Sequence, residues 1–351
     1  MHFCSSVALI ILAVSHSLHG VKELPEDHCT FMQIHHSVRS RAHEAFEACS
    51  EVVPVKGSLK PMPAMTFGTS REGILRDSEI GQTLTNATKA FLTLGGRNID
   101  TAIRYSNHEY VAAAIRESGV PREEIWITDK IQPAQVTTSS DVVKAVENSL
   151  KELDVDYIDL MLLHWPHGEV GGGGYNVELW RGLLEAKKAG YILNAGVSNY
   201  NVSDLEELVH ETGELPVVNE MEFHPFSPNS TLEIVNWCQE QGIAIMAFDL
   251  TGGPILQGDI QSDAVSALAE KYQVSDVQVL LRWGLDKGVA PIFTSDTPEH
   301  IKEDLNCSGL KHLSESDMQM LESSEKPDFW FTYHHPDYGH DYESGTVTVG
   351  P

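Results

Sequence analysis

Residues 157–164 read YIDLMLLH, a short apolar run that ends in an ionisable side chain and precedes a helix-like segment. Six further runs have the same form: 97–105 (RNIDTAIRY), 125–130 (IWITDK), 192–199 (ILNAGVSN), 216–224 (PVVNEMEFH), 243–249 (IAIMAFD) and 290–295 (APIFTS). Strands that alternate with helices form a parallel sheet. Polar and ionisable residues at the carboxyl ends of such strands are typical of a (β/α)₈ TIM barrel, whose active site lies at that end. We therefore predict an α/β protein with this barrel fold.

The other elements follow from the spacing of apolar residues. We expect a hairpin within 51–69 that leads into a first barrel strand at 64–67. The predicted helices cover roughly 78–94, 108–118, 139–153, 176–189, 202–211, 230–241, 262–273 and 298–305. The predicted organisation is a signal-like segment (1–20), an N-terminal extension (21–50), the barrel (51–325) and a C-terminal tail (326–351). The tail is rich in aromatic residues and His, and three interpretations stay open: a cap over the pocket, a disordered end or a metal-binding segment.

Residues 1–20 (MHFCSSVALIILAVSHSLHG) have a short apolar core followed by small residues, as in a secretory signal, although no Lys or Arg precedes the core. We expect entry into the secretory pathway or an organelle lumen. The alternative is a cytoplasmic protein with a hydrophobic N-terminal tail. The run is too short to span a bilayer, so no stable membrane span is expected. In an oxidising compartment, Cys29 and Cys49 could form a disulfide.

The composition narrows the function. The chain has 351 residues, is 41% hydrophobic and carries a formal net charge of −27, with 24 basic against 51 acidic residues. It is long enough for one large barrel. The acidic balance argues against a nucleic-acid partner. No Cys pair has metal-ligand spacing, so no metal site is expected.

Four residues at successive strand ends form a plausible site for carbonyl reduction. Asp100 and Tyr105 close the second predicted strand, Lys130 closes the third and His164 closes the fourth. A Tyr phenol titrates near 10, and a neighbouring ammonium favours its ionised form. A carboxylate can hold the ammonium, and a His can donate a hydrogen bond to a carbonyl. Each residue alone is also explained by capping, packing or surface charge, so the prediction depends on the set.

The sequence resembles the aldo-keto reductase family from about Met62 to Leu321. The matching stretches are MPAMTFGT (62–69), RNIDTAIRYSNHEYVAAAI (97–115), YIDLMLLHWP (157–166), GYILNAGVSNYN (190–201), VVNEMEFHPF (217–226) and HIKEDL (300–305). The spacing of the four strand-end residues matches the catalytic tetrad of that family. The resemblance therefore implies a nicotinamide-dependent barrel enzyme that binds its dinucleotide without a Rossmann glycine motif.

The resemblance also implies individual roles. Tyr105 would be the general acid, Lys130 would lower the pKa of Tyr105, Asp100 would pair with Lys130, and His164 would orient the carbonyl. The implied cofactor-binding residues lie at the ends of several strands: Gly68, Thr69, Ser198, Asn199, Glu220, Phe248, Asp249, Ser295 and His300. Of these, Ser198 and Asn199 would hold the nicotinamide carboxamide and Phe248 would stack on the ring.

The chain departs from the family pattern in the cofactor site. Glu220 stands where Gln is usual, and Asp249 stands where Ser normally contacts the diphosphate. Thr294 and His300 replace the Lys and Arg that clamp the adenosine 2′-phosphate, and Asp304 replaces Asn. Thr and neutral His recognise phosphate less well than Lys and Arg. NADPH is the expected cofactor, and the altered clamp makes use of NADH, or loss of cofactor binding, an open alternative.

The predicted function is reduction of a small aldehyde or ketone to an alcohol by a monomeric enzyme. Trp165 and Arg104 are candidate pocket residues, because each adjoins a catalytic residue; packing or a surface ion pair explains them equally well. Two alternatives remain. The barrel could be a non-catalytic binding module with a degraded cofactor site. It could also be a hydrolase with paired carboxylates, for which only Glu222 and Asp249 are candidates.

Overall fold

The structure is a computed structural model, and it describes residues 48–71, 73–74, 77–166, 175–250, 262–306 and 312–323. Several predictions lie outside these residues: the signal-like segment, nearly all of the N-terminal extension and the C-terminal tail. Cys49 is disulfide-bonded, and Cys29 of the expected pair lies outside the described residues. Cys238 is a free, buried cysteine.

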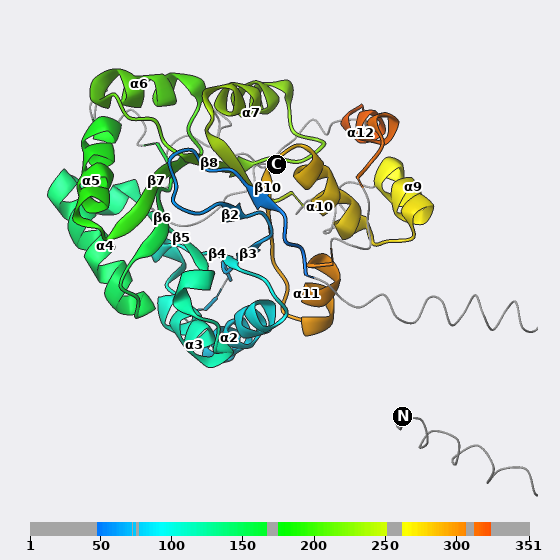
Figure 1. Cartoon of the computed structure of the whole chain (residues 1–351), viewed down its shortest axis with the longest axis horizontal. Helices are drawn as coiled ribbons and strands as arrows, with labels where there is room; N and C mark the ends of the chain where they lie inside the picture. The colour runs from blue at the N-terminus through cyan, green and yellow to red at the C-terminus, as the bar shows by residue number, and fades with distance from the viewer. Residues whose placement is uncertain are drawn as a thin grey trace, which may run out of the picture. The chain divides into compact units, whose positions relative to one another are not determined.

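Eight parallel strands close into a barrel and confirm the predicted (β/α)₈ fold (Figure 1). In barrel order, they are β3 (Thr66–Gly68), β4 (Asn98–Asp100), β5 (Trp126–Ile131), β6 (Ile158–Leu163), β7 (Ile192–Ser198), β8 (Val218–Glu222), β9 (Ala244–Phe248) and β10 (Ala290–Phe293), which pairs with β3. Neighbouring strands are consecutive in the sequence, so all their carboxyl ends lie at one end of the barrel.

Helices surround the strands (Figure 1). They are α2 (Ser78–Thr93), α3 (His108–Ser118), α4 (Ser139–Leu153), α5 (Tyr175–Ala189), α6 (Val202–Thr212), α7 (Asn229–Gln241), α9 (Asp263–Tyr272), α10 (Asp276–Asp286), α11 (Pro298–Asp304) and α12 (Glu315–Glu322). Side-chain caps begin several of them. Asn201 and Asp204 form a reciprocal capping box at the start of α6, and Ser275 and Gln278 form another at the start of α10.

The sequence prediction was wrong in three details. The strand predicted at 97–105 ends at Asp100, and the 3₁₀ helix η1 (Ile103–Tyr105) follows, so Tyr105 does not close a strand. The first barrel strand covers 66–68 rather than 64–67. Helices α10 and α12 were not predicted. The connection from β9 to β10 contains α9 and α10 in succession, so a strict strand–helix alternation cannot locate both.

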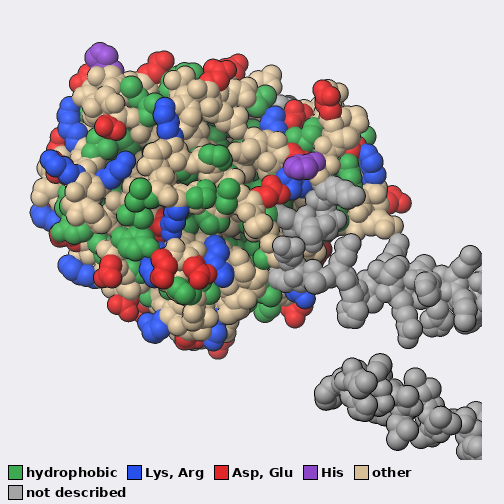
Figure 2. Space-filling model, viewed as in Figure 1, with side chains coloured by type: hydrophobic (Ala, Val, Ile, Leu, Met, Phe, Trp, Pro, Cys, Tyr) green, Lys and Arg blue, Asp and Glu red, His purple; other side chains and the backbone are tan. Residues whose placement is uncertain are grey.

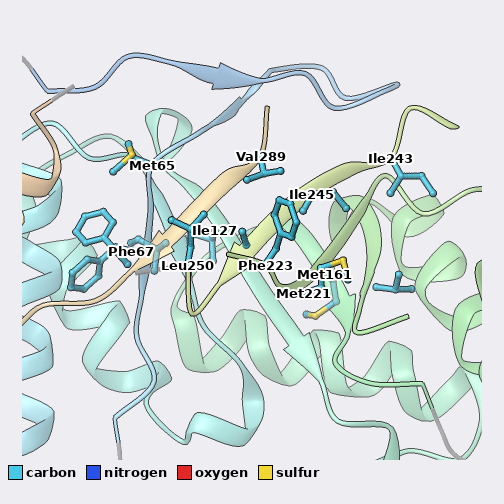
Figure 3. Packing of buried hydrophobic residues seen from close by; sticks show 14 of the residues in the cluster. Met65, Phe67, Ile127, Met161, Met221, Phe223, Ile243, Ile245, Leu250 and Val289 are labelled. Carbon is cyan, nitrogen blue, oxygen red and sulfur yellow. The ribbon is translucent and has the colours of Figure 1, made fainter. Parts of the chain in front are cut away.

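The hydrophobic core has two layers. The larger layer lies between the strands and the helices, and Phe67 of β3 belongs to it. The Phe67 ring stacks on Phe91 of α2 at 5.0 Å between centroids and meets the edge of Phe293 of β10 at 5.8 Å. Figure 3 shows Phe67 and Ile127 among the side chains of this layer. Tight packing of this kind fixes the strand ends that carry the polar residues.

A smaller core layer fills the amino-terminal end of the barrel. The predicted hairpin is present as β1 (Val52–Val53) paired antiparallel with β2 (Met62–Pro63), and it crosses in front of the barrel strands in Figure 1. Val53 and Met62 pack with Trp126, which begins β5. Lys60, from the same hairpin, lies 2.6 Å from the buried carboxylate of Asp159. The hairpin therefore closes the end of the barrel opposite the strand carboxyl ends.

Charges of both signs are interspersed on the face shown in Figure 2, where Lys and Arg lie among Asp and Glu. Among the described helices, none combines the length and the hydropathy that a membrane span requires.

Candidate active site

Lys130, at the carboxyl end of β5, is fully buried and forms a bidentate ion pair with Asp100 at the end of β4. Its Nζ atom lies 2.5 and 2.6 Å from the two Asp100 carboxylate oxygens and donates to the Thr101 carbonyl at 3.1 Å. Burial alone would lower the pKa of the Lys130 ammonium. Asp100 and Glu220 outweigh that effect and raise the pKa well above its ordinary value, so Lys130 stays charged.

Tyr105 joins this pair from η1. Lys130 Nζ lies 3.4 Å from the Tyr105 hydroxyl oxygen and 5.1 Å from the centre of its ring. Burial raises the pKa of the Tyr105 phenol; the Lys130 charge lowers it, whereas Asp100 and Glu220 raise it. The net result is a pKa above 10, because burial and the two carboxyl groups outweigh the Lys130 charge. At neutral pH, Tyr105 is a protonated phenol.

Glu220 of β8 is a third carboxyl group around the same ammonium. Its Oε1 atom lies 3.3 Å from Lys130 Nζ, and its side chain is almost completely buried. Burial raises the pKa of Glu220 to about 8, and the adjacent Asp100 carboxyl adds to the increase although Lys130 opposes it. Sequence reasoning placed Glu220 at the cofactor and did not predict its contact with Lys130.

His164 follows β6 and lies beside Tyr105. The two rings meet edge to face with centroids 5.8 Å apart, and Trp165 stacks on His164 at 5.6 Å. Burial, together with the charges of Lys130 and Arg104, lowers the pKa of His164 well below its ordinary value. The His164 imidazole is therefore neutral at pH 7. Both candidate pocket residues, Trp165 and Arg104, lie near His164, and Arg104 is exposed in η1.

The predicted carboxamide-binding residues lie beside this cluster. Ser198 ends β7 directly opposite Glu220 of β8 in the barrel register. Asn199 has a left-handed φ of 64°, and its side chain donates to the His164 carbonyl at 3.1 Å and to Ser198 Oγ at 2.9 Å. Its backbone N–H donates to the Glu220 carbonyl. These bonds hold two polar side chains at the mouth of the barrel.

The turn after β3 is tied to the next strand. The N–H and hydroxyl of Thr69 both donate to the Asp100 carbonyl, at 3.0 and 2.9 Å. Asn107 then donates to the Thr69 carbonyl at 2.8 Å. Gly68 ends β3, and its carbonyl accepts a hydrogen bond from Thr294 Oγ1 at 2.8 Å. The structure thus brings Gly68 and Thr69 together with Asp100 and with the segment after β10.

The segment after β9 has less favourable chemistry for a phosphate. Phe248 ends β9 and is partly buried, as stacking on a ring requires. Asp249 has a left-handed φ of 52°. Burial and the nearby Glu222 carboxylate raise the pKa of Asp249 to about 6. Asp249 is still an anion at pH 7. It therefore remains unfavourable for a phosphate, at the position where the family pattern has Ser.

A cation that the sequence did not predict lies at the altered phosphate clamp. Arg71, in the loop after β3, donates to Thr294 Oγ1 at 2.6 Å and pairs with Asp296 at 2.9 Å. Its Nη2 also reaches the Ser295 carbonyl at 3.4 Å. His300 hydrogen-bonds Thr297 at the start of α11 and is exposed. The only sequence signal for Arg71 was its position three residues after Gly68.

The donor set at the mouth of the barrel fits a nicotinamide cofactor. The Ser198 hydroxyl and the Asn199 side chain lie together at the end of β7, and the buried Nδ1 atom of His164 has no hydrogen-bond partner among the described residues. Phe248 ends β9, and Arg71 places a positive charge beside the segment after β10. These residues can bind a polar aromatic ring and an anionic group at once.

The barrel, with its buried Asp100–Lys130 ion pair beside Tyr105 and His164, is typical of the barrel oxidoreductases that reduce carbonyl groups. The model of the Aldo/keto reductase family matches residues 64–326, and the chain belongs to that family. It is a carbonyl-reducing oxidoreductase.

Relatives from distant organisms support this assignment. The chain is 37% identical to a glyoxal reductase of Bacillus subtilis over 71% of this chain and 86% of that protein. It is 34% identical to an NAD/NADP-dependent indole-3-acetaldehyde reductase of Schizosaccharomyces pombe, over 77% and 93%. The solved structure of a Bombyx mori aldo-keto reductase in complex with NADP superposes with a TM-score of 0.69 at 29% identity, over 78% and 92% of the two chains.

Proposed function

We propose that this protein reduces a small aldehyde or ketone to the alcohol with a nicotinamide cofactor, and that Tyr105 delivers the proton. The observation that carries the proposal is the contact of the buried Lys130 ammonium with both Asp100 and the Tyr105 hydroxyl. The cofactor, when bound, supplies the hydride that the protein itself cannot provide. The residues described above bind and orient it.

Proton transfer follows from the charges around Tyr105. A phenol with a raised pKa keeps its proton at pH 7 and gives it up only to a strong base, such as the alkoxide that forms when a carbonyl accepts hydride. Lys130 then stabilises the phenolate that remains, because its charge lies 3.4 Å from the Tyr105 oxygen. Asp100 holds the ammonium in that position through its bidentate contact.

His164 contributes as a neutral donor. An imidazolium at this point would add a second positive charge beside Lys130, and the lowered pKa of His164 prevents that. A neutral imidazole can donate one hydrogen bond to a carbonyl oxygen and so orient it toward Tyr105. Trp165, stacked on His164, offers an apolar wall for a small substrate.

For the cofactor we propose NADPH, with NADH as a second possibility. The S. pombe relative is named as dependent on NAD or NADP, and the B. mori structure holds NADP. Arg71 at the clamp supports binding of a 2′-phosphate in this chain, whereas Thr294 and His300 offer weaker phosphate contacts. We propose a monomer, as the sequence predicted.

The deciding experiment is Tyr105→Phe, which removes the hydroxyl and keeps the ring. We expect kcat for a small dicarbonyl substrate such as glyoxal to decrease by about 10²–10⁴-fold, as for loss of a general acid. The dissociation constant for NADPH should change little, which fluorescence titration measures. Full activity in Tyr105→Phe would show that another group delivers the proton.

The alternative is a binding module with a degraded cofactor site. Asp249, Thr294 and His300 favour it, because each replaces a residue that contacts phosphate in the family pattern. Titration of the wild-type protein with NADPH and with NADH separates the two functions. Micromolar binding of either cofactor supports the reductase, and no binding up to millimolar concentration supports the module.

A further inference from the structure

One ammonium lies between two buried carboxyl groups in the pocket. Lys130 Nζ of β5 is 2.5 Å from Asp100 of β4 and 3.3 Å from Glu220 of β8. The two carboxyls are therefore neighbours around the same Lys130 Nζ atom. Two buried carboxylates that face one ammonium would leave a net negative charge out of water, which costs more than retaining one proton.

No other cation compensates Glu220 from the strands that flank it. In the barrel register, β7 places Ser198 beside it and β9 places Met246 beside it, and neither is charged. Tyr105 and His164 face the cluster from η1 and from the end of β6, and both are neutral at pH 7. Asp249, beyond the end of β9, is another acid. The Asp100–Glu220 pair therefore holds one proton at neutral pH and releases it near pH 8.

Glu220 is also the acid beside the proposed nicotinamide site. Its backbone carbonyl accepts from the N–H of Asn199, and its Cα is paired with that of Ser198. Ser198 and Asn199 are the residues proposed to hold the carboxamide. The ring of the oxidised cofactor carries a positive charge and the ring of the reduced cofactor carries none. A charge on Glu220 therefore acts differently on the two forms.

We propose that Glu220 discriminates between the two redox forms of the cofactor, because its carboxylate stabilises the cationic ring of the oxidised form. The inference rests on the proposed function, since it requires that a nicotinamide cofactor binds here. Protonated Glu220 is neutral, like the Gln that is usual at this position, and it does not discriminate. Above pH 8 the site prefers NADP⁺ more strongly than it does at pH 6.5.

Thermodynamic linkage makes the effect reciprocal. If ionised Glu220 binds NADP⁺ more tightly, NADP⁺ must in turn promote ionisation of Glu220 by the same factor. Binding of NADP⁺ near pH 7 then releases a proton from Glu220 into the buffer, and binding of NADPH does not. Calorimetry in buffers of different ionisation enthalpy measures that proton and needs no variant.

The main experiment measures dissociation constants of full-length protein for NADP⁺ and for NADPH between pH 6.5 and 9. The quantity of interest is the ratio of the NADPH constant to the NADP⁺ constant. Groups at the adenosine end act on both cofactors alike and cancel from the ratio. We expect the ratio to increase by about tenfold across this range, as for a shift of one pKa unit.

Glu220→Gln keeps the shape of the side chain, which then stays neutral at every pH. In this variant the ratio of the two dissociation constants should be independent of pH, and binding of NADP⁺ should release no proton. Asp304→Asn is the matched control. Asp304, on α11, is also an acid whose pKa is raised by burial, to about 7, but the family pattern assigns its position to the adenosine clamp rather than to the nicotinamide site. The ratio in Asp304→Asn should keep the wild-type pH dependence.

Two negative results have different meanings. If both cofactors bind and the wild-type ratio does not change with pH, or changes equally in Glu220→Gln, the inference is wrong and the proposed function stands. If neither cofactor binds wild-type protein, the proposed function is wrong, and the inference is overturned with it.

Discussion

At the scale of single residues, Lys130 determines the properties of the site. It is one of the largest fully buried side chains among the described residues, and its ammonium contacts three ionisable groups. A buried Lys without partners would lose its proton. Here the two carboxyls keep it charged, so the site has a fixed positive charge beside the Tyr105 oxygen.

The sequence predicted the four residues of the tetrad but not the other side chains of the site, Glu220 at Lys130 and Arg71 at Thr294. Asp100, Lys130 and His164 follow apolar strands, and parallel strands bring such residues together in any barrel of this kind. The contact of Glu220 with Lys130 crosses the barrel interior, and it depends on a side-chain conformation that no sequence pattern encodes. Arg71 was missed for a similar reason, because its partners Thr294 and Asp296 are more than 200 positions away in the chain.

Substitutions of Arg71 and of Asp296 should change the affinity for NADPH in opposite directions. Arg71→Ala removes the cation at the clamp, so we expect NADPH to bind about tenfold more weakly, while NADH binding changes less because NADH lacks the 2′-phosphate. Asp296→Asn removes the anion that pairs with Arg71 at 2.9 Å, so NADPH should bind more tightly. Fluorescence titration with both cofactors measures these changes. Equal losses for NADPH and NADH in Arg71→Ala would place Arg71 at a phosphate common to both.

At the scale of elements, the strands were easier to predict than the connections. Strands β5 to β9 lie within or next to the predicted runs, since each is buried along almost its whole length. Helix α10 was missed although its capping box, Ser275 with Gln278, is a recognisable start signal. It follows α9 with no strand between them, so the expected alternation of strands and helices leaves no place for it.

A buried ion pair joins α3 to β5 and gives the barrel a predicted pH dependence of stability. His108, at the start of α3, lies 3.1 Å from Asp129 of β5 and 2.9 Å from Glu152 of α4. Burial lowers the pKa of His108, but both acids raise it, and the net value is about 9 against 6.5 in an unfolded chain. The charged His108 thus stabilises the folded state fully below pH 6.5, and this contribution is lost as the pH rises through 9.

We expect His108 to contribute about 2–3 kcal/mol more to the free energy of unfolding at pH 6.5 than at pH 9.5, because a pKa difference of one unit corresponds to 1.36 kcal/mol. Urea titration at both pH values measures it. His108→Gln should reduce the difference, whereas His210→Gln, a change at an exposed His on α6, should leave it intact. An identical difference in all three proteins would assign the pH dependence to other groups.

At the scale of the whole molecule, residues on both sides of the predicted boundary at residue 51 contact the barrel. Cys49 donates its N–H to the Leu305 carbonyl at 2.8 Å, and Glu51 contacts the buried Arg282 at 2.5 and 3.1 Å. Val53 packs into the smaller core. These contacts tie the start of the barrel to α10 and to the end of α11, which no local pattern in 48–53 predicts. The secretory location stays a prediction, and a disulfide at Cys49 is compatible with it.

A pair of truncated chains tests this boundary. We expect a chain that begins at residue 46 to unfold at nearly the same denaturant concentration as the full chain. A chain that begins at residue 54 should be less stable by about 2–4 kcal/mol, because Val53 is no longer buried and Arg282 loses Glu51. Both are compared under reducing conditions, so that the disulfide of Cys49 does not contribute. Equal stability of the two truncated chains would show that residues 46–53 do not stabilise the barrel and that its boundary lies at residue 54 or later.

The hairpin at the closed end of the barrel has a practical consequence for measurement. Leu59, in the loop between β1 and β2, is 95% exposed and lies at the end opposite the strand carboxyl ends that carry Tyr105 and Lys130. A Cys introduced at position 59 would accept a fluorophore or a surface linker without entering the pocket. Protein immobilised on an electrode or sensor chip through this loop would be oriented uniformly, with the strand carboxyl ends directed into the solution.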